Sequence, residues 1–280
     1  MKKILALLLT IIMTFSFVAC AGNGDGNETS NVADSTAADS TPAQSEADDS
    51  AAADSTPAES GADDTTGSAD VKVMTYAEYI AADIDAAVVI EAYVQAKQSW
   101  WDNKATLYTQ DNDGAYFIYN AAVSEEDYAK LVPGTKIRVT GYKANFSGEI
   151  EIAEGATVEI LEGSFVATPF DATALLGTDD LIKHQNELVS FKGLTVAAYD
   201  ESGAAFAYKN PTEKTDDLYF KVNLNDKTYE FCVEFYLCGK DTDVYKAVEA
   251  LKVGDKIDVE GFLYWYEGAN PHITSVKAAQ

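Results

Sequence analysis

"LVPGTKIRVTGY" (Leu131–Tyr142) and "LKVGDKIDVEGF" (Leu251–Phe262) decide the fold of this chain. The two stretches lie 120 positions apart, are identical at six of twelve positions, and align without a gap. Each contains Gly-x-Lys-Ile-x-Val-x-Gly, in which the Ile and the Val fall on one face of a strand. A phrase of this length that occurs twice predicts two copies of one structural unit.

A short helix is predicted before each repeated phrase. In "SEEDYAKL", Ser124 and Asp127 have the spacing of an N-terminal cap, and in "DTDVYKAVEAL" either Asp241 or Thr242 can cap. Glycines close both segments, Gly134 after a proline in the first copy and Gly254 in the second. Each copy thus enters its repeated strand from a helix.

Three strands precede each helix and one more follows the repeated strand. Alternating apolar residues around Asp113-Gly114 and around Asn225-Asp226 indicate hairpins, and longer strand patterns come before them. After the repeated strand, a glycine turn leads to "EIEI" in the first copy and to "HITSV" in the second. Five strands with a helix between the third and fourth is the order of the OB-fold, a small Greek-key barrel. We therefore expect a mainly β protein with two tandem OB-fold-like five-stranded barrels.

The repeated phrase has a structural role in this interpretation. We expect its Ile and Val to lie in the barrel cores, and we expect Gly141 and Gly261 where a strand bends or lacks room for a side chain. The expected core residues are Ile137, Val139, Ile257 and Val259.

The N-terminus has the pattern of an export signal. Lys2 and Lys3 precede an apolar run from Ile4 to Val18, which is short for a membrane-spanning helix. The run ends in Phe17-Val18-Ala19-Cys20, which resembles the lipobox of bacterial lipoproteins, although Phe17 stands where Leu is usual. The resemblance implies a signal peptide over 1–20 and acylation of Cys20, which would anchor the chain at the extracytoplasmic face of the cell membrane.

The next fifty residues have a different composition. Residues 21–70 contain twelve acidic side chains and no Lys, Arg or aromatic residue. Such a segment cannot bury enough apolar surface to offset its ordering entropy, so we expect a disordered acidic linker. The remaining 210 residues divide at the repeat into a first module over 71–162 and a second over 163–280.

The repeated strand after a short helix also resembles the fourth strand of OB-fold modules in secreted bacterial proteins, including those appended to extracellular nucleases. Together with the lipobox, the chain resembles uncharacterised surface lipoproteins of anaerobic gut Firmicutes with tandem OB-fold-like modules. The resemblance covers Thr75 to Val276 and the lipobox. It implies a fold and a location but no activity.

Candidate ligand-binding residues lie in the loops where OB-folds bind ligands, those that join strands 1–2 and strands 4–5. In these loops aromatic side chains stand beside polar ones, as in sites that stack on sugars or bases. The candidates are Trp100, Trp101, Phe146, Tyr264, Trp265, Tyr266 and His272. The alternative is that Trp100 or Trp265 plugs a barrel or packs at the joint between the modules. Adjacent Trp100 and Trp101 point to opposite sides of an extended chain, so we expect one binding platform from this pair at most.

The charge of the chain bears on its partners. Each module has a net charge of −8, and Arg138 is the only arginine of the protein. Non-specific nucleic-acid binding needs a positive groove that releases counterions, so we do not expect nucleic acid as a ligand.

We expect no enzymatic activity, cofactor or metal. His184 and His272 lie in different modules, and neither has the spacing of a catalytic triad or a metal site. Asp111 to Gly114 resembles the start of a calcium loop, but the later ligands are absent and a hairpin turn explains it better.

Two cysteines remain after Cys20. Six residues of one extended strand would separate Cys232 from Cys238 by roughly 20 Å, so a disulfide would require the chain to fold back between them. The preferred interpretation is two reduced, buried thiols.

Two functions remain open. The first is a lipid-anchored module that binds an extracellular glycan or peptide through the loop aromatics. The second is an assembly protein whose acidic head docks onto another envelope protein, with its tryptophans packed internally.

Overall fold

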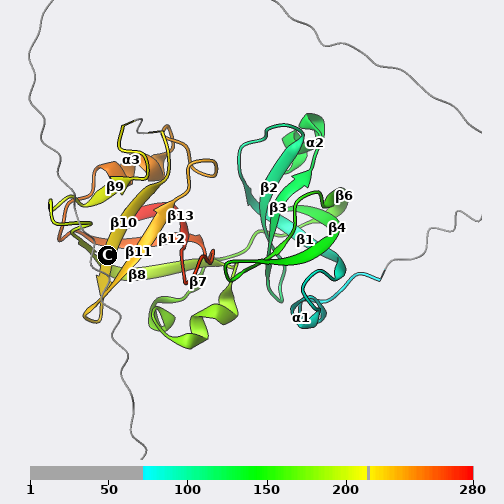
Figure 1. Ribbon diagram of the computed structural model, residues 1–280, viewed down its shortest axis with the longest axis horizontal. Helices are drawn as coiled ribbons and strands as arrows, with labels where there is room; N and C mark the ends of the chain where they lie inside the picture. The colour runs from blue at the N-terminus through cyan, green and yellow to red at the C-terminus, as the bar shows by residue number, and fades with distance from the viewer. Residues whose placement is uncertain (1–71, 213–214, 280) are drawn as a thin grey trace, which may run out of the picture. The chain divides into compact units, whose positions relative to one another are not determined.

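The computed structural model describes residues 72–212 and 215–279, which fold into two closed barrels in tandem (Figure 1). The predicted fold class is therefore confirmed. The signal peptide, the lipobox with Cys20 and the acidic segment up to residue 70 lie outside the described residues, so these remain predictions.

The first barrel is closed because β1 pairs with both β2 and β4. Its strands are β1 (Ala87–Lys97), β2 (Lys104–Gln110), β3 (Ala115–Ala122), β4 (Thr135–Phe146), β5 (Glu149–Ile152) and β6 (Thr157–Ser164). Both β5 and β6 pair antiparallel to β4 and parallel to β3, so together they make the fifth strand of the barrel. The sequence interpretation found β5 but missed β6.

The second barrel repeats this plan, since β8 pairs with both β10 and β12. Its strands are β8 (Leu188–Ala197), β10 (Leu218–Leu224), β11 (Lys227–Val233), β12 (Lys256–Phe262) and β13 (His272–Ala278), with short edge strands β7 (Phe170–Asp171) and β9 (Phe206–Tyr208). Strand β13 joins β12 to β11 and so closes the barrel, as β5 and β6 do in the first one.

Short helices precede the fourth strand of each barrel, as predicted. The helices are α1 (Tyr76–Ala81), α2 (Glu125–Lys130) and α3 (Asp243–Glu249), and the 3₁₀ segments are η1 (Thr173–Leu175) and η2 (Asp179–His184). The Ser124 hydroxyl accepts the amide of Asp127 at the start of α2, and of the two caps proposed for α3 the structure uses Thr242. The sequence interpretation did not anticipate α1. In the part of the chain that the structure describes, every helix is too short or too polar to cross a membrane.

The repeated phrase forms β4 and β12, and its apolar residues lie in the cores as expected. Ile137 and Val139 are fully buried in the first barrel, and Ile257 and Val259 are buried in the second. A Cβ added at Gly261 would lie 2.2 Å from the carbonyl oxygen of His272, so the second glycine is required by close backbone approach.

The Asp111–Gly114 segment is a hairpin turn. The Asp111 carboxylate accepts hydrogen bonds from the backbone amides of Asp113 and Gly114 at 2.7 and 2.9 Å. These two hydrogen bonds stabilise the turn. Among the described residues no group of three or more His, Cys, Asp or Glu side chains could hold a metal ion. Cys232 and Cys238 are both free and buried.

The two barrels belong to one compact unit and share an interface. Tyr108 and Phe117 of the first barrel pack against Phe262 of the second, with ring centroids of Tyr108 and Phe262 4.6 Å apart. The Tyr108 hydroxyl also lies 2.7 Å from Nδ1 of His272. The interface thus combines a buried cluster of aromatic rings with a buried polar pair, Tyr108 and His272. The two barrels therefore pack against each other and are not joined by the chain connection alone.

Candidate functional site: a pocket between the barrels

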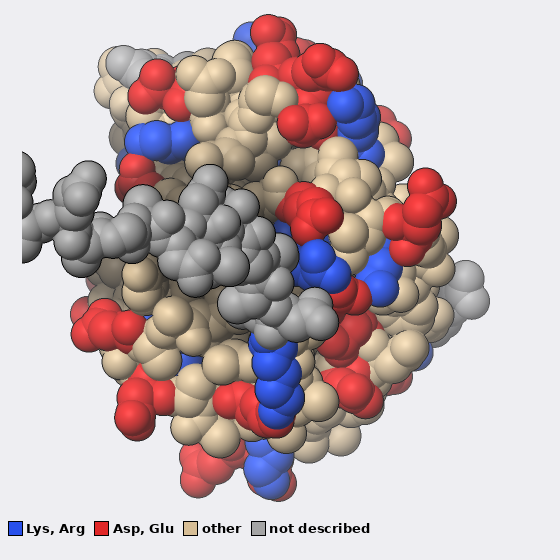
Figure 2. All heavy atoms as spheres, turned by 90° about the vertical axis from the view of Figure 1, so that its right-hand side faces the viewer, with Lys and Arg blue, Asp and Glu red and all other residues tan. Residues whose placement is uncertain are grey.

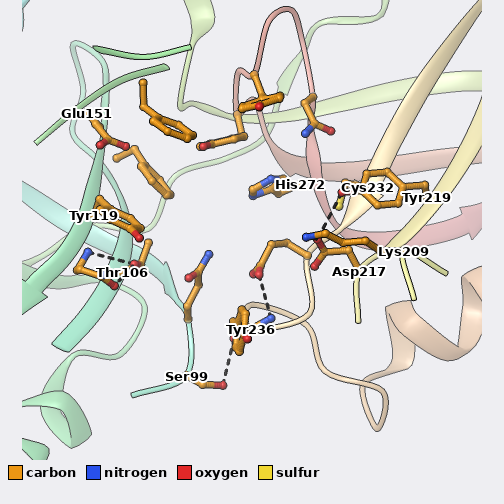
Figure 3. Close-up of a pocket in the computed structure, with 18 of the residues that line it drawn as sticks. Ser99, Thr106, Tyr119, Glu151, Lys209, Asp217, Tyr219, Cys232, Tyr236 and His272 are labelled. Atoms are coloured by element: carbon orange, nitrogen blue, oxygen red, sulfur yellow. Dashed lines mark hydrogen bonds and ion pairs between the residues drawn. The ribbon is translucent and has the colours of Figure 1, made fainter. Parts of the chain in front are cut away.

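A pocket of about 800 Å³ lies between the two barrels (Figure 3). From the first barrel it is lined by residues of β2, β3 and β5, by the last residue of β4 and by the loop that follows β1. From the second barrel it is lined by β10, β11, the loop between β12 and β13, and the start of β13. Strands β2 and β3, and their counterparts β10 and β11, form the face on which OB-folds bind ligands. Both faces therefore line one pocket.

Five of the seven candidate residues line this pocket: Trp101, Phe146, Tyr264, Tyr266 and His272. Trp101, Phe146 and Tyr266 are 57%, 53% and 47% exposed, and the rings of Phe146 and Tyr266 lie 5.8 Å apart. The end of β4 in the first barrel and a loop of the second barrel thus place aromatic rings side by side at the pocket. Large rings of this kind can stack on a ligand that enters it.

The other two candidates pack against protein. The indole Nε1 of Trp100 donates to the carbonyl oxygen of Val123 at 2.9 Å. Trp265 packs against the core of the second barrel, and its backbone amide donates to Glu149 of the first barrel at 2.8 Å. In the pair Trp100–Trp101 only the second side chain lines the pocket.

Deeper in the pocket, His272 is held in its neutral form. Its side chain stacks on Tyr264 with centroids 4.3 Å apart, and burial lowers the pKa of the imidazole to about 3. Gln98 donates to the Tyr108 oxygen at 3.3 Å, so the Tyr108 hydroxyl proton can be donated to Nδ1 of His272. A neutral imidazole that accepts at Nδ1 keeps its proton on Nε2. His272 therefore positions Tyr264 and can offer one donor.

Carboxylates from both barrels also line the pocket. Burial raises the pKa of Glu151 on β5 to about 7, and burial likewise raises the pKa of Glu234, which follows β11, to about 7. Glu234 accepts the amides of Tyr236 and Leu237, which partly offsets the effect of burial. Carboxyl groups that are close to half-protonated at neutral pH can accept or donate hydrogen bonds to hydroxyl groups.

The lysine of the pocket is already paired. Lys209 lies 3.0 Å from Asp217 and 4.0 Å from Asp216. Figure 3 shows Lys209, Asp217 and Tyr219 on one side of the pocket and Glu151 and Tyr119 on the other. Cys232 lies beside Tyr219, and burial raises the pKa of its thiol well above the usual range, so it is not poised as a nucleophile.

Sequence reasoning missed the polar lining of the pocket. Four of the missed residues lie on strands or just after them: Glu151, Tyr119, Tyr219 and Glu234. The alternation of side chains along each strand places them on the outer face of their own barrel. The signal that could have found Tyr119 and Tyr219 is that the outward face of strands 2 and 3 is the ligand face of this fold.

Comparisons with known proteins give a likeness in fold. No protein-family model matches the chain, and no curated protein matches it in sequence. The HINa domain of Ifi202 in complex with 20-base-pair double-stranded DNA is 12% identical, with 70% of this chain and 100% of that chain covered and a TM-score of 0.32. The p204 HINb domain is 12% identical over the same shares, with a TM-score of 0.33. A murine DNA-binding protein bound to double-stranded DNA is 12% identical, covers 69% of this chain and 96% of that chain, and has a TM-score of 0.34.

One expectation from the sequence is corrected by these structures. We did not expect nucleic acid as a ligand, because each module has a net charge of −8. Two of the structures similar in fold to this chain contain double-stranded DNA, so the expectation that net charge alone excludes nucleic acid is withdrawn. The physical reason is that net charge is a sum over a module, whereas binding depends on where the charges lie.

Proposed function

We propose that the pocket between the barrels binds an extracellular glycan and that the protein is a binding module rather than an enzyme. The observation that carries the proposal is the meeting of loop aromatics from both barrels over a pocket of about 800 Å³. This volume falls in the usual range of small-ligand sites, which is about 300–1,000 Å³. Aromatic faces can stack on sugar rings, while amide and carboxyl groups fix the hydroxyls.

The polar groups of the pocket suit a ligand with many hydroxyl groups. Asn120 and Thr106 bond to each other at one wall, and Asn270 lies at another. A smaller pocket of about 340 Å³ shares Tyr219, Tyr266 and Asn270 with the first. A ligand of more than one sugar unit could therefore extend from one pocket into the next.

The test is a glycan array followed by calorimetric titration of each hit. Trp101→Ala should weaken binding by about tenfold, which is about 1.4 kcal/mol, because the variant removes an exposed stacking surface. The fold should be unaffected, because the Trp101 side chain is 57% exposed.

Tyr142→Ala is the matched control. Tyr142 is 62% exposed on β4 and does not line the pocket, so its loss should leave binding unchanged. Double-stranded DNA and unrelated peptides form two further arms of the titration. No glycan hit, or equal losses in both variants, would overturn the proposal, and binding of DNA or peptide at Trp101 would reassign the ligand.

The second candidate function is assembly with another envelope protein. It is favoured by the packed positions of Trp100 and Trp265, which this alternative expects. A partner that is captured equally by the natural protein and by Trp101→Ala, in the absence of glycan binding, would favour it.

We also propose that the barrels are held at the extracytoplasmic face of the membrane through Cys20. The support is the sequence Phe17 to Cys20 after an apolar run. A site for an extracellular glycan agrees with that location.

A further inference from the structure

We propose that the ligand carries a positively charged amine, which lies against Glu151 in the pocket between the barrels. An oligosaccharide of amino sugars has this chemistry. The inference rests on the proposed function, because it names the class of glycan that the same pocket takes.

Glu151 is the first reason. Its side chain lines the pocket and is only 7% exposed. No described residue donates a hydrogen bond to its carboxylate or forms an ion pair with it, and burial is the cause of its raised pKa. Buried carboxylates in folded proteins are normally paired, so a carboxylate that faces an open pocket without a partner points to a partner in the ligand.

The rings around Glu151 are the second reason. Phe117, Tyr119 and Tyr264 line the pocket, and Phe117 and Tyr264 meet edge to face with centroids 5.1 Å apart. The faces of aromatic rings attract cations, and this attraction strengthens when the site is shielded from water. Phe117 is buried and Tyr264 is stacked on His272, whereas Tyr119 is 42% exposed and lies on the same side of the pocket as Glu151 (Figure 3). A carboxylate near an exposed ring favours an amine over a neutral group of similar size.

The balance of charge in the pocket is the third reason. Three carboxylates line it, Glu151, Asp217 and Glu234, against Lys209, which is already paired with Asp217. The net charge of each module is also negative, at −8, and acidic side chains with basic ones between them are spread over the face seen in Figure 2. A field of this sign raises the local concentration of cations and hastens their association.

The experiment compares two oligosaccharides of the same length with the full chain by calorimetric titration. One is a hexamer of glucosamine, whose amines are charged, and the other is the hexamer of N-acetylglucosamine. We expect the amine form to bind at least tenfold more tightly, with a preference that shrinks as salt is raised from 50 to 500 mM.

Glu151→Gln is the decisive variant. Glutamine keeps the approximate shape of the side chain but not its charge, so the ratio of the two affinities should fall from at least tenfold to about one. Glu159→Gln makes the same change at an exposed residue outside the pocket and should leave the preference intact.

Each outcome decides between the two proposals. Equal binding of both hexamers would overturn the amine inference and leave the glycan proposal standing. Binding of trilysine that depends on Glu151, without binding of either sugar, would support the amine site and overturn the glycan proposal. Binding of none of the three probes would overturn both.

Discussion

Glu149 lies at the joint between the barrels with its side chain fully buried. One carboxylate oxygen accepts the amide of Trp265 at 2.8 Å and the side-chain amide of Gln185 at 3.2 Å. The other oxygen, Oε1, has no hydrogen-bond partner among the described residues. Burial is the largest cause that raises the pKa of Glu149, to about 8. The joint therefore contains a carboxyl group that is stable there in its protonated form.

The raised pKa of Glu149 predicts how the free energy of unfolding depends on pH. The folded protein keeps a proton on Glu149 up to about pH 8, whereas the unfolded chain releases it near pH 4.5. The native state binds more protons between these values, so the free energy of unfolding should fall as pH rises through this window. Glu149→Gln should be more stable than the natural protein at pH 9 by about 1 kcal/mol or more, and nearly equal to it at pH 5.

Urea denaturation at pH 5, 7 and 9 measures this difference. Glu151 and Glu234 also have raised pKa values, so the variant should flatten the pH dependence without abolishing it. Glu159→Gln, at an exposed position, serves as the control. An unchanged slope in Glu149→Gln would show that Glu149 is ionised in the folded protein.

At the scale of elements, the repeated strand is constrained where it passes closest to its neighbour. Gly261 on β12 lies against the backbone of His272 and Ile273 on β13, and the pairing shifts register between Glu260 and Gly261. Gly261→Ala should cost about 3 kcal/mol, because the nearest atoms belong to the backbone and cannot turn aside.

Thermal and urea unfolding of Gly261→Ala measure this cost. Gly239→Ala is the control, since the nearest atom to its added Cβ would be 3.7 Å away, an ordinary contact. If both variants had the same stability, the strand would have to accommodate the methyl group by shifting, and the close approach of β12 and β13 would not be essential.

At the scale of the whole molecule, the interface between the barrels predicts cooperative unfolding. Ile137→Ala and Ile257→Ala each empty part of one core and should cost about 2–5 kcal/mol. Because Tyr108, Phe117 and Phe262 pack together and Tyr108 contacts His272, loss of one barrel exposes a buried cluster of the other. Each variant should therefore shift one shared transition to lower temperature, as calorimetry would show. Two transitions, of which each variant moves only one, would mean that the barrels unfold independently.

The anchor is also a property of the whole molecule. If Cys20 is acylated, the protein should partition into the detergent phase, and Cys20→Ser should remain unprocessed or be released from the membrane. Cys238→Ser retains Cys20 and should partition as the natural protein does. Partitioning that Cys20→Ser does not change would contradict the lipid anchor.

The sequence by itself determined the local features of this protein. The spacing of Ile137 and Val139, the cap at Ser124 and the hairpin at Asn225-Asp226 are set by residues a few positions apart, so their patterns were sufficient. Repetition of these features gave two barrels, because the same local preferences repeat in the same order. A strand such as β6 was missed because its residues are only partly buried and its pattern is weak.

Only the tertiary structure decided which residues form the candidate site. In β5, alternation directs Glu149 and Glu151 away from the core of their own barrel, which predicts exposed carboxylates. The second barrel covers that face, so Glu149 is fully buried and Glu151 is 7% exposed at the pocket. The same packing seats Trp265 in the joint and leaves Trp101 at the pocket. Periodicity determines the face of a strand that a side chain occupies, but what covers that face depends on contacts between residues more than a hundred positions apart.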